Sequence, residues 1–420
     1  MGWNLAELVQ RHDVPGAQVA VLENGEIRDE AAGVLSLHTQ VETTTDAVFK
    51  IGSITKIWTA TLVRQLACEG ALNLDRPVAG YLPGFRLSSP EATATITARH
   101  LLTHTSGIAA NHFTDTGRND DALEKFVATL ADEEHLLPPG ALLSYSNTGF
   151  AILGRLVEVL RGKRFHDALR DHLVTPLGLR TVATDPYEAI LHRVAVGHVD
   201  SVPTKTWAIS YRTAPSGSHL AMSARDLLTF VRHHLTDPAL ATLREPQVDD
   251  VPEFGDGIRS WGLGWMIFDD GVLGHTGNSK GQKAFLRVDP STGVAVAVLT
   301  NSTDSEPLAQ EIFAANGIHM ASPPVPPANP APIDDRMCGT YRTPLYDITL
   351  TRTALIYRPR NELAESFLHR PRVEVVRLGD DTIINVERRF GVHQVTSLTG
   401  SDEHGRAQYL HNGAAAYRIA

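Results

Sequence analysis

A serine and a lysine three residues apart are the first pair in this sequence that could do chemistry together. Ser53 and Lys56 stand in the segment FKIGSITKIWTA, and residues i and i+3 of a helix lie on the same face. At a helix N-terminus, Ser53 would meet the positive end of the helix dipole, which favours a developing anion. Lys56 could accept the serine proton if burial lowered its pKa toward neutrality. A serine N-cap followed by a surface lysine is the alternative, since S-x-x-K alone is common.

A tyrosine and an asparagine follow at the expected start of another helix. Tyr145 and Asn147 lie just after the Pro-Pro-Gly turn at 138–140, and Tyr145 is 92 residues beyond Ser53. The tyrosine could act as a phenolate or as a proton relay. Asn147 could hold an acyl amide or Lys56. A buried tyrosine beside an asparagine N-cap would explain the same residues without any chemistry.

A Gly-His-Thr-Gly segment at 274–277 precedes an expected β-hairpin. His275 offers a cationic or hydrogen-bonding side chain, and Thr276 and Gly277 follow it. On a sheet edge, these residues would line a cleft and present backbone N–H groups to an acyl oxygen. A glycine-rich turn is the simpler explanation.

The three motifs, in this order, resemble those of the penicillin-recognising serine hydrolases. This family includes class C β-lactamases, D-alanyl-D-alanine peptidases and related esterases and D-aminopeptidases, with the pattern S-x-x-K, then Y-x-N, then K-T-G or H-T-G. Flanking segments are also similar, among them LLTHTSGI at 101–108, PLGL at 176–179 and WGLGW at 261–265. The resemblance covers residues 5–320, and three ordered motifs are far more specific than one.

The resemblance implies a β-lactamase/transpeptidase-like fold and a role for each matched residue. Ser53 would be the acylated nucleophile, Lys56 its activating partner and Tyr145 the general base or proton relay. Asn147 would orient the substrate amide and Lys56. The backbone N–H groups of Ser53 and Asn278 would form the oxyanion hole. The third motif and the residue after it would complete the substrate-binding and oxyanion set: His275, Thr276, Gly277 and Asn278.

The third motif departs from the pattern of β-lactamases and transpeptidases, which carry lysine where this chain has His275. A lysine holds a substrate carboxylate with a permanent charge, whereas a histidine titrates near pH ~6.5. This difference disfavours a β-lactam substrate and favours an esterase, a peptidase or an acyltransferase.

Several other motifs fit their chemistry poorly. Ser279 lies in a G-x-S-x-G string at 277–281, but a nucleophile elbow needs a strand, a sharp turn and a helix, and strands are expected on both sides here. His100 and His104 resemble half of a zinc helix without its glutamate. His233 and His234 are expected on a solvated helix surface. No P-loop or dinucleotide loop occurs, so we expect no metal and no cofactor.

The elements that must position these residues point to an α+β body with an antiparallel sheet. Strands are expected near 18–27 and as a hairpin at 285–299, at the two ends of the body. Helices are expected between them at 53–69, 121–130, 147–160 and 223–235, from apolar residues at helical spacing. Helices segregated against an antiparallel sheet are typical of the α+β class.

A proline-rich segment at 321–332, ASPPVPPANPAP, separates the body from a tail. Such a sequence favours an extended, semi-rigid spacer, so the predicted division is a hydrolase domain at 1–320, a linker at 321–332 and a domain at 333–420. The tail has β-rich runs at 346–357, 373–378, 382–386 and 408–419 and predicts a small antiparallel barrel or sandwich. It resembles the lipocalin-like C-terminal domain of some family members. We expect few contacts across the linker.

Composition limits the partners and the compartment. The 420 residues carry a formal charge of −10, which argues against nucleic acid as a partner because phosphate binding needs a basic footprint. The two cysteines, Cys68 and Cys338, are expected to be free thiols. No signal peptide and no membrane-length apolar run is visible. We therefore expect a cytoplasmic protein acting on a small-molecule or peptide substrate, with no membrane partner.

The sequence thus predicts a serine hydrolase that cleaves an ester or amide, including D-amino-acid-containing peptides or esters, through an acyl-Ser53 intermediate. In the first alternative, an amine intercepts the same intermediate, which makes the protein an acyltransferase or peptide cyclase of a natural-product pathway. The second alternative is a non-catalytic binding module on this fold, which would need no activated nucleophile.

Overall fold

The computed structural model describes residues 3–255, 257–389 and 392–420. Among them, seven antiparallel strands form the main sheet of the body, in the order β2-β1-β12-β11-β10-β9-β8. Their bounds are β1 (Gly16–Glu23), β2 (Glu26–Gly33), β8 (Ile258–Trp261), β9 (Met266–Phe268), β10 (Leu273–Ser279), β11 (Gln282–Asp289) and β12 (Val294–Thr300). The expected antiparallel sheet and its hairpin near 285–299 are confirmed.

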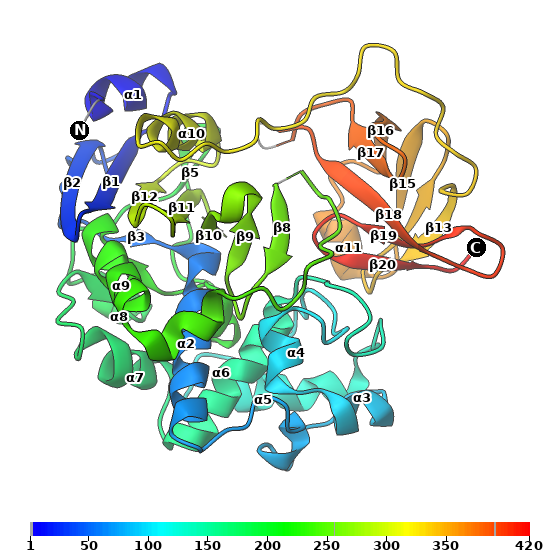
Figure 1. Cartoon of the computed structure of the whole chain (residues 1–420), viewed down its shortest axis with the longest axis horizontal. Helices are drawn as coiled ribbons and strands as arrows, with labels where there is room; N and C mark the ends of the chain where they lie inside the picture. Colours follow the sequence, from blue (N-terminus) through cyan, green and yellow to red (C-terminus); the bar gives the residue numbers. More distant parts are fainter. Residues whose placement is uncertain (1–2, 256, 390–391) are drawn as a thin grey trace.

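Helices cover both faces of this sheet (Figure 1). Alternate residues of β12 face opposite sides: Val296 and Val298 pack toward α1 and α10, whereas Ala295 and Ala297 pack toward the large helical region. A strand buried on both faces reads as a continuous apolar run, which is the pattern of β12. The helices are α1 (Leu5–Arg11), α2 (Thr55–Cys68), α3 (Pro90–Thr95), α4 (Ala98–Leu102), α5 (Ala122–Thr129), α6 (Asn147–Arg161), α7 (Phe165–Leu169), α8 (Pro186–Ala189), α9 (Ala224–Thr236) and α10 (Glu306–Ala315).

Short elements connect the layers. Small sheets are formed by β3 (Phe49–Lys50), β7 (Ala221–Met222) and β4 (Val182–Ala183), and by β5 (His198–Val199) and β6 (Val202–Pro203). The short helical turns are η1 (Gly52–Ile54), η2 (Val78–Gly80), η3 (Leu130–Asp132), η4 (Arg170–Val174), η5 (Tyr211–Ser216), η6 (Pro238–Arg244) and η7 (Asp269–Gly271). The helix expected at 53–69 is present, but its first turn is the tighter η1, so Ser53 lies within a 3₁₀ turn.

The helical region is held together by packing of α2 against α6. Ser146 caps α6 by accepting from the backbone N–H of Gly149, and Gly162 ends the helix in the left-handed conformation, with φ 65°. The expectation for His234 is wrong: its side chain is fully buried and its Nε2 lies 2.9 Å from the hydroxyl of Thr61 on α2. Burial lowers the pKa of His234 to about 3.

Eight antiparallel strands of the described tail, paired in sequence order, close into a barrel at the right of Figure 1. This is the up-and-down architecture of lipocalins, but apolar side chains fill the interior. The strand expected over 346–357 is two strands, and β13, β18 and α11 were not expected. The elements are β13 (Gly339–Arg342), β14 (Tyr346–Leu350), β15 (Ala354–Pro359), β16 (Arg372–Arg377), β17 (Thr382–Asn385), β18 (Val395–Ser401), β19 (Ala407–His411), β20 (Ala415–Arg418) and α11 (Glu362–Phe367).

The expectation of few contacts between body and tail is wrong. The hydroxyl of Tyr417 donates to the carboxylate of Glu134, and the guanidinium of Arg360 pairs with the same carboxylate at 3.2 Å. The ring centroids of Phe113 and Phe367 on α11 are 5.4 Å apart. The proline-rich segment arches between the two parts in Figure 1 without keeping them apart. The boundaries at 320 and 332 stay predictions.

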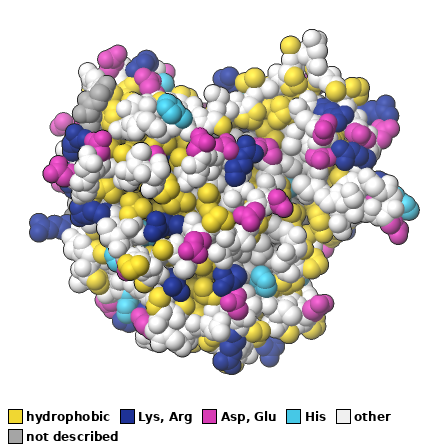
Figure 2. Space-filling view, viewed as in Figure 1, with side chains coloured by type: hydrophobic (Ala, Val, Ile, Leu, Met, Phe, Trp, Pro, Cys, Tyr) yellow, Lys and Arg dark blue, Asp and Glu magenta, His cyan; other side chains and the backbone are white. Residues whose placement is uncertain are grey.

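Acidic and basic side chains are interspersed on the face shown in Figure 2. Cys68 and Cys338 are free, as expected. None of the helices in the described ranges is long and apolar enough to cross a bilayer.

Candidate active site

Ser53 is placed by the tight turn that leads into α2. The preceding Gly52 has φ +52°, in the left-handed region that glycine adopts without strain. A Cβ added to Gly52 would lie 2.6 Å from the backbone nitrogen of Asn278 on β10. The turn therefore requires glycine, and this glycine brings the start of α2 against the sheet edge.

Lys56 is fully buried one turn after Ser53. Its Nζ lies 3.1 Å from Oγ of Ser53, 2.7 Å from Oδ1 of Asn147 and 2.7 Å from the carbonyl oxygen of Ser216. These neighbours carry no charge, and burial lowers the pKa of Lys56 well below its usual value. A neutral amine would donate to the two nearer oxygens and keep its lone pair for the hydroxyl proton of Ser53.

Tyr145 approaches the same serine. Burial raises the pKa of its phenol, while the hydrogen bond to Ser53 acts in the opposite direction with a smaller effect. Tyr145 is thus a neutral phenol that can donate to Oγ of Ser53, which favours the proton-relay interpretation over the phenolate. Nζ of Lys56 lies 4.7 Å from the centroid of the tyrosine ring, so the ring face also supports the amine when it is protonated.

Asn147 is the first residue of α6, and its amide bridges the lysine and the cleft. Its Oδ1 accepts from Lys56, and its Nδ2 donates to Oδ1 of Asn111 at 2.9 Å. Both ends of the amide are therefore used, which fixes its orientation. The cleft side of Asn147 is available to a substrate because Asn147 lines the cavity in front of Ser53.

The outer end of β10 supplies the second half of the candidate oxyanion hole. Ser279 and Gln282 are paired across a two-residue turn, and Asn278 is paired with Lys283. Hydrogen-bonded and non-hydrogen-bonded pairs alternate in an antiparallel ladder, so the N–H of Asn278 points away from β11 and toward Ser53. Gly277 permits this approach, because a Cβ there would lie 1.9 Å from the carbonyl oxygen of Ile51.

His275 differs from the sequence expectation. Its side chain is fully buried, and burial lowers its pKa to about 3, so it does not titrate near pH 6.5. Nδ1 lies 2.8 Å from the carbonyl oxygen of Thr276 and must carry the proton, since a carbonyl only accepts. Thr276 is held by Arg287, whose guanidinium donates to its hydroxyl at 3.2 Å. The third motif therefore acts as a neutral support beneath Tyr145.

Two cavities share Asn278 as a lining residue. The one in front of Ser53 has a volume of about 310 Å³. Many of its lining residues carry polar groups, although more of its exposed surface is apolar: Ser53, Asn111, His112, Phe113, Asn147, Ile209, Ser210, Arg212, Thr213, Ser216, Gly217, Ser218, Asn278 and Ser279. The other has a volume of about 200 Å³ and lies between β10, α10 and the barrel, where Phe254, Phe285 and Phe313 contribute apolar surface. Ser279, at the turn between β10 and β11, also lines the cavity in front of Ser53.

Sequence reasoning missed the supports of the motif residues. His104 is fully buried, with its ring centroid 4.3 Å from that of Tyr145, and its Nδ1 accepts from the N–H of Ser146 at 3.0 Å. His104 lies in the LLTHTSGI segment, which resembles the family's sequences but gave no indication that this histidine packs against Tyr145. The carbonyl of Ser216 and the amide of Asn111 had no sequence signal.

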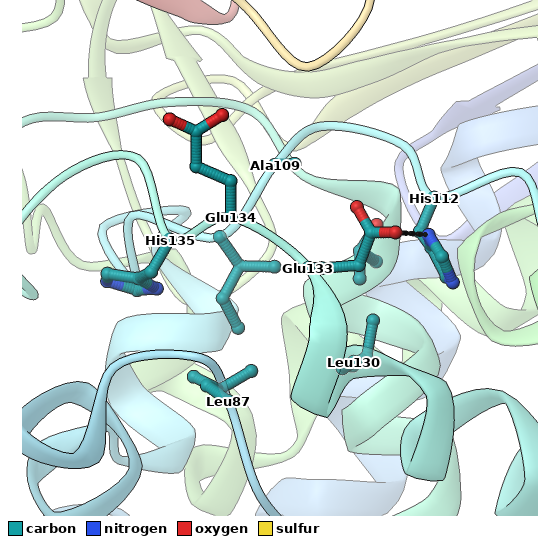
Figure 3. Close-up of a pocket in the computed structure, with 9 residues that line it drawn as sticks. Leu87, Ala109, His112, Leu130, Glu133, Glu134 and His135 are labelled. Carbon is teal, nitrogen blue, oxygen red and sulfur yellow. Dashed lines mark ion pairs between the residues drawn. The ribbon is translucent and has the colours of Figure 1, made fainter.

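A third, small cavity shares the lining residue His112 with the cavity in front of Ser53 (Figure 3). His112 and Glu133 form an ion pair across it at 2.8 Å, and the ring of His135 lies on its other side. No cluster of three or more potential metal ligands occurs within the described residues. Ser53 is not among the residues that line this third cavity.

The chain is similar to several known proteins in sequence and in fold. The chain is 41% identical over 356 residues to penicillin-binding protein 4 of Amycolatopsis lactamdurans, covering 79% of this chain and 93% of that protein. The crystal structure of SurE superimposes with a TM-score of 0.81 at 30% identity, covering 98% and 97% of the two chains. A class C β-lactamase from Rhodobacter sphaeroides superimposes with a TM-score of 0.59 at 26% identity, covering 70% and 92%.

The superposition on SurE covers nearly the whole chain and so includes the barrel, whereas the superposition on the β-lactamase covers 70% of the chain. A family model described as Beta-lactamase matches residues 4–319, which contain all three motifs. The chain therefore belongs to the Beta-lactamase family and is, broadly, a serine hydrolase or acyl transferase.

Proposed function

We propose that the protein cleaves an ester or amide of a D-amino-acid-containing substrate through an acyl-Ser53 intermediate. One observation carries this proposal: the hydroxyl of Ser53 lies 3.1 Å from the buried amine of Lys56 and next to the half-buried phenol of Tyr145. A pure binding module would gain nothing from a serine activated in this way.

Acylation begins with attack of Oγ of Ser53 on the substrate carbonyl carbon. The hydroxyl proton passes to the lone pair of Lys56, which is available because burial keeps the amine neutral. The carbonyl oxygen becomes an oxyanion between the N–H groups of Ser53 and Asn278. Two preorganised donors at this point stabilise the tetrahedral intermediate more than the substrate.

Collapse of the tetrahedral intermediate breaks the bond to the leaving group. Tyr145 gives its proton to the departing oxygen or nitrogen and regains one from protonated Lys56, so one proton leaves with the first product and both side chains return to their starting states. Water then attacks the acyl-serine by the reverse route, and its proton returns to Ser53. Asn147 keeps Lys56 aligned throughout, because its amide oxygen lies 2.7 Å from the amine.

Two similarities support the substrate class. One solved structure that superimposes with a TM-score of 0.80 at 29% identity is that of SurE with D-Leu, and it covers 98% of this chain. The relative from Amycolatopsis lactamdurans is named a penicillin-binding protein. The cleft in front of Ser53 combines apolar surface with polar groups such as those of Asn111 and Asn147, which suits a substrate with an apolar side chain and amide groups.

Transfer of the acyl group to an amine is a second candidate function, and the two cavities at Asn278 favour it. One cavity can hold the acyl group while the other holds a second substrate, which hydrolysis does not need. Intramolecular attack by a substrate amine would give a cyclic peptide.

A single experiment separates hydrolysis from transfer. The protein is incubated with a D-leucine p-nitrophenyl ester, with and without a tenfold excess of an aliphatic amine, and products are identified by mass. Free acid alone in both reactions supports hydrolysis, and amide in proportion to the amine supports transfer. No release of p-nitrophenol above that of Ser53→Ala would contradict both functions.

A further inference from the structure

Two histidines, one in the body and one in the barrel, form hydrogen bonds with the short segment 143–146 that leads into α6. In the body, His104 accepts two hydrogen bonds from the segment. Its carbonyl oxygen accepts from the N–H of Ser144 at 2.7 Å, and its ring Nδ1 accepts from the N–H of Ser146. On the barrel side, Nε2 of His411 contacts the carbonyl oxygen of Leu143 at 2.7 Å.

The barrel turn after His411 forms further hydrogen bonds with the same segment. The N–H of Tyr145 donates to the carbonyl oxygen of Gly413 at 2.9 Å, and the N–H of Gly413 contacts Nδ1 of His411 at 3.3 Å. The hydroxyl of Ser144 accepts from the N–H of Ala415 at 3.1 Å. Alternate backbone groups of the segment are thus held by the body and by the hairpin of β19 and β20.

The hydrogen-bond pattern fixes the tautomer of His411. The carbonyl of Leu143 can only accept, so Nε2 carries the proton, and the N–H of Gly413 donates, so Nδ1 is unprotonated. His411 is fully buried, and burial lowers its pKa to about 4, which agrees with a neutral ring. The ring closes a loop of hydrogen bonds that runs from Leu143 through His411 and Gly413 to Tyr145.

We propose that His411 is a positioning residue for Tyr145, and that the barrel thereby belongs to the active site. This inference rests on the proposed role of Tyr145 in proton transfer. The phenol of Tyr145 must lie next to Oγ of Ser53. The backbone that carries Tyr145 is held in place by hydrogen bonds to His411 and Gly413 of the barrel. A shift of about 1 Å at a reacting group can cost on the order of 100-fold in rate.

The test compares three variants of the full chain. His411→Phe removes the donor and the acceptor, while His411→Gln keeps an amide donor at the position of Nε2. Tyr417→Phe is the matched control, because it removes another barrel-to-body hydrogen bond, to Glu134, that does not reach Tyr145. Each variant is assayed for kcat and KM with a D-leucine p-nitrophenyl ester, for the rate of labelling by a fluorophosphonate and for thermal stability.

The proposal predicts that His411→Phe lowers kcat and the labelling rate about 10- to 100-fold with KM within about 2-fold. His411→Gln should recover activity to within about 3-fold of wild type, and Tyr417→Phe should match wild type.

A folded His411→Phe with wild-type kcat would overturn the proposal, as would equal losses in His411→Phe and Tyr417→Phe. If the proposed function itself is wrong, the wild-type protein takes no label on Ser53. The two failures therefore give different results.

Discussion

The side-chain oxygen of Asn147 lies 2.7 Å from the amine of Lys56, and no carboxylate among the described residues pairs with that amine. The amide supplies a hydrogen bond without a charge. This combination lets the lysine be both fixed in place and neutral, which is the state required to accept a proton from Ser53.

Asn147→Asp tests this relationship. A carboxylate next to Lys56 favours the protonated amine and raises its pKa, so the acid limb of kcat/KM should move to higher pH and the rate at pH 7 should fall at least 10-fold. Asn111→Asp is the control, since it adds the same charge one hydrogen bond farther from Lys56. An unshifted pH profile from 5 to 10 in Asn147→Asp would mean that Lys56 is not the base.

Gly52→Ala should block the candidate oxyanion hole. The new methyl group would stand 2.6 Å from the nitrogen of Asn278, where the oxyanion must sit. Loss of an oxyanion donor costs about 100- to 1,000-fold in kcat. Gly70→Ala is matched to it, because Gly70 also has a positive φ, +76°, but a Cβ there meets nothing within 4 Å. Equal activity of the two variants would rule out Asn278 as an oxyanion donor.

Stability should fall as the pH drops below about 6.5, because several buried histidines are neutral. Burial lowers the pKa to about 3 for His234 and His275 and to about 4 for His219 and His411. The unfolded chain binds these protons at pH ~6.5, so each histidine contributes stability above that pH and loses it toward its folded pKa, by about 1.4 kcal/mol per pH unit. Urea unfolding of wild type and His234→Gln from pH 7.5 to 5 measures the slope. An identical slope in both would contradict the burial of His234.

Removing the barrel should remove activity as well as contacts. A chain that ends at Ser322 leaves the carbonyl of Leu143 and the N–H of Tyr145 without their partners in the hairpin of β19 and β20. Each of these hydrogen bonds, once exchanged for one to water, costs about 0.5–1.5 kcal/mol of stability, so the truncated body should melt earlier and acylate Ser53 more slowly. Unchanged melting and unchanged labelling by a fluorophosphonate would show that the barrel is an independent appendage.

Much of the site could be predicted because its residues are linked through short local patterns. Ser53 and Lys56 share one helical turn, and Tyr145 and Asn147 flank one helix start, so the spacing places each pair together, while the resemblance of the three ordered motifs indicates their roles. The antiparallel hairpin of β11 and β12 was equally local, with a turn sequence between two apolar runs.

The remainder depends on partners far away in the chain. His234 was expected in solvent because its helix looks amphipathic, yet its ring meets Thr61, 173 residues earlier. His411 lies in a tail hairpin whose sequence indicates only a turn, and its partner Leu143 is 268 residues away. The pKa of His275 likewise follows from tertiary burial, which no local spacing encodes.

The most direct test of Ser53 as the nucleophile is the intact mass of the protein after incubation with a fluorophosphonate, followed by peptide mapping. The account predicts one adduct per chain, on Ser53, which is lost in Ser53→Ala and retained in Ser279→Ala. An adduct on Ser279, or an adduct that persists in Ser53→Ala, would contradict the assignment of Ser53 as the nucleophile.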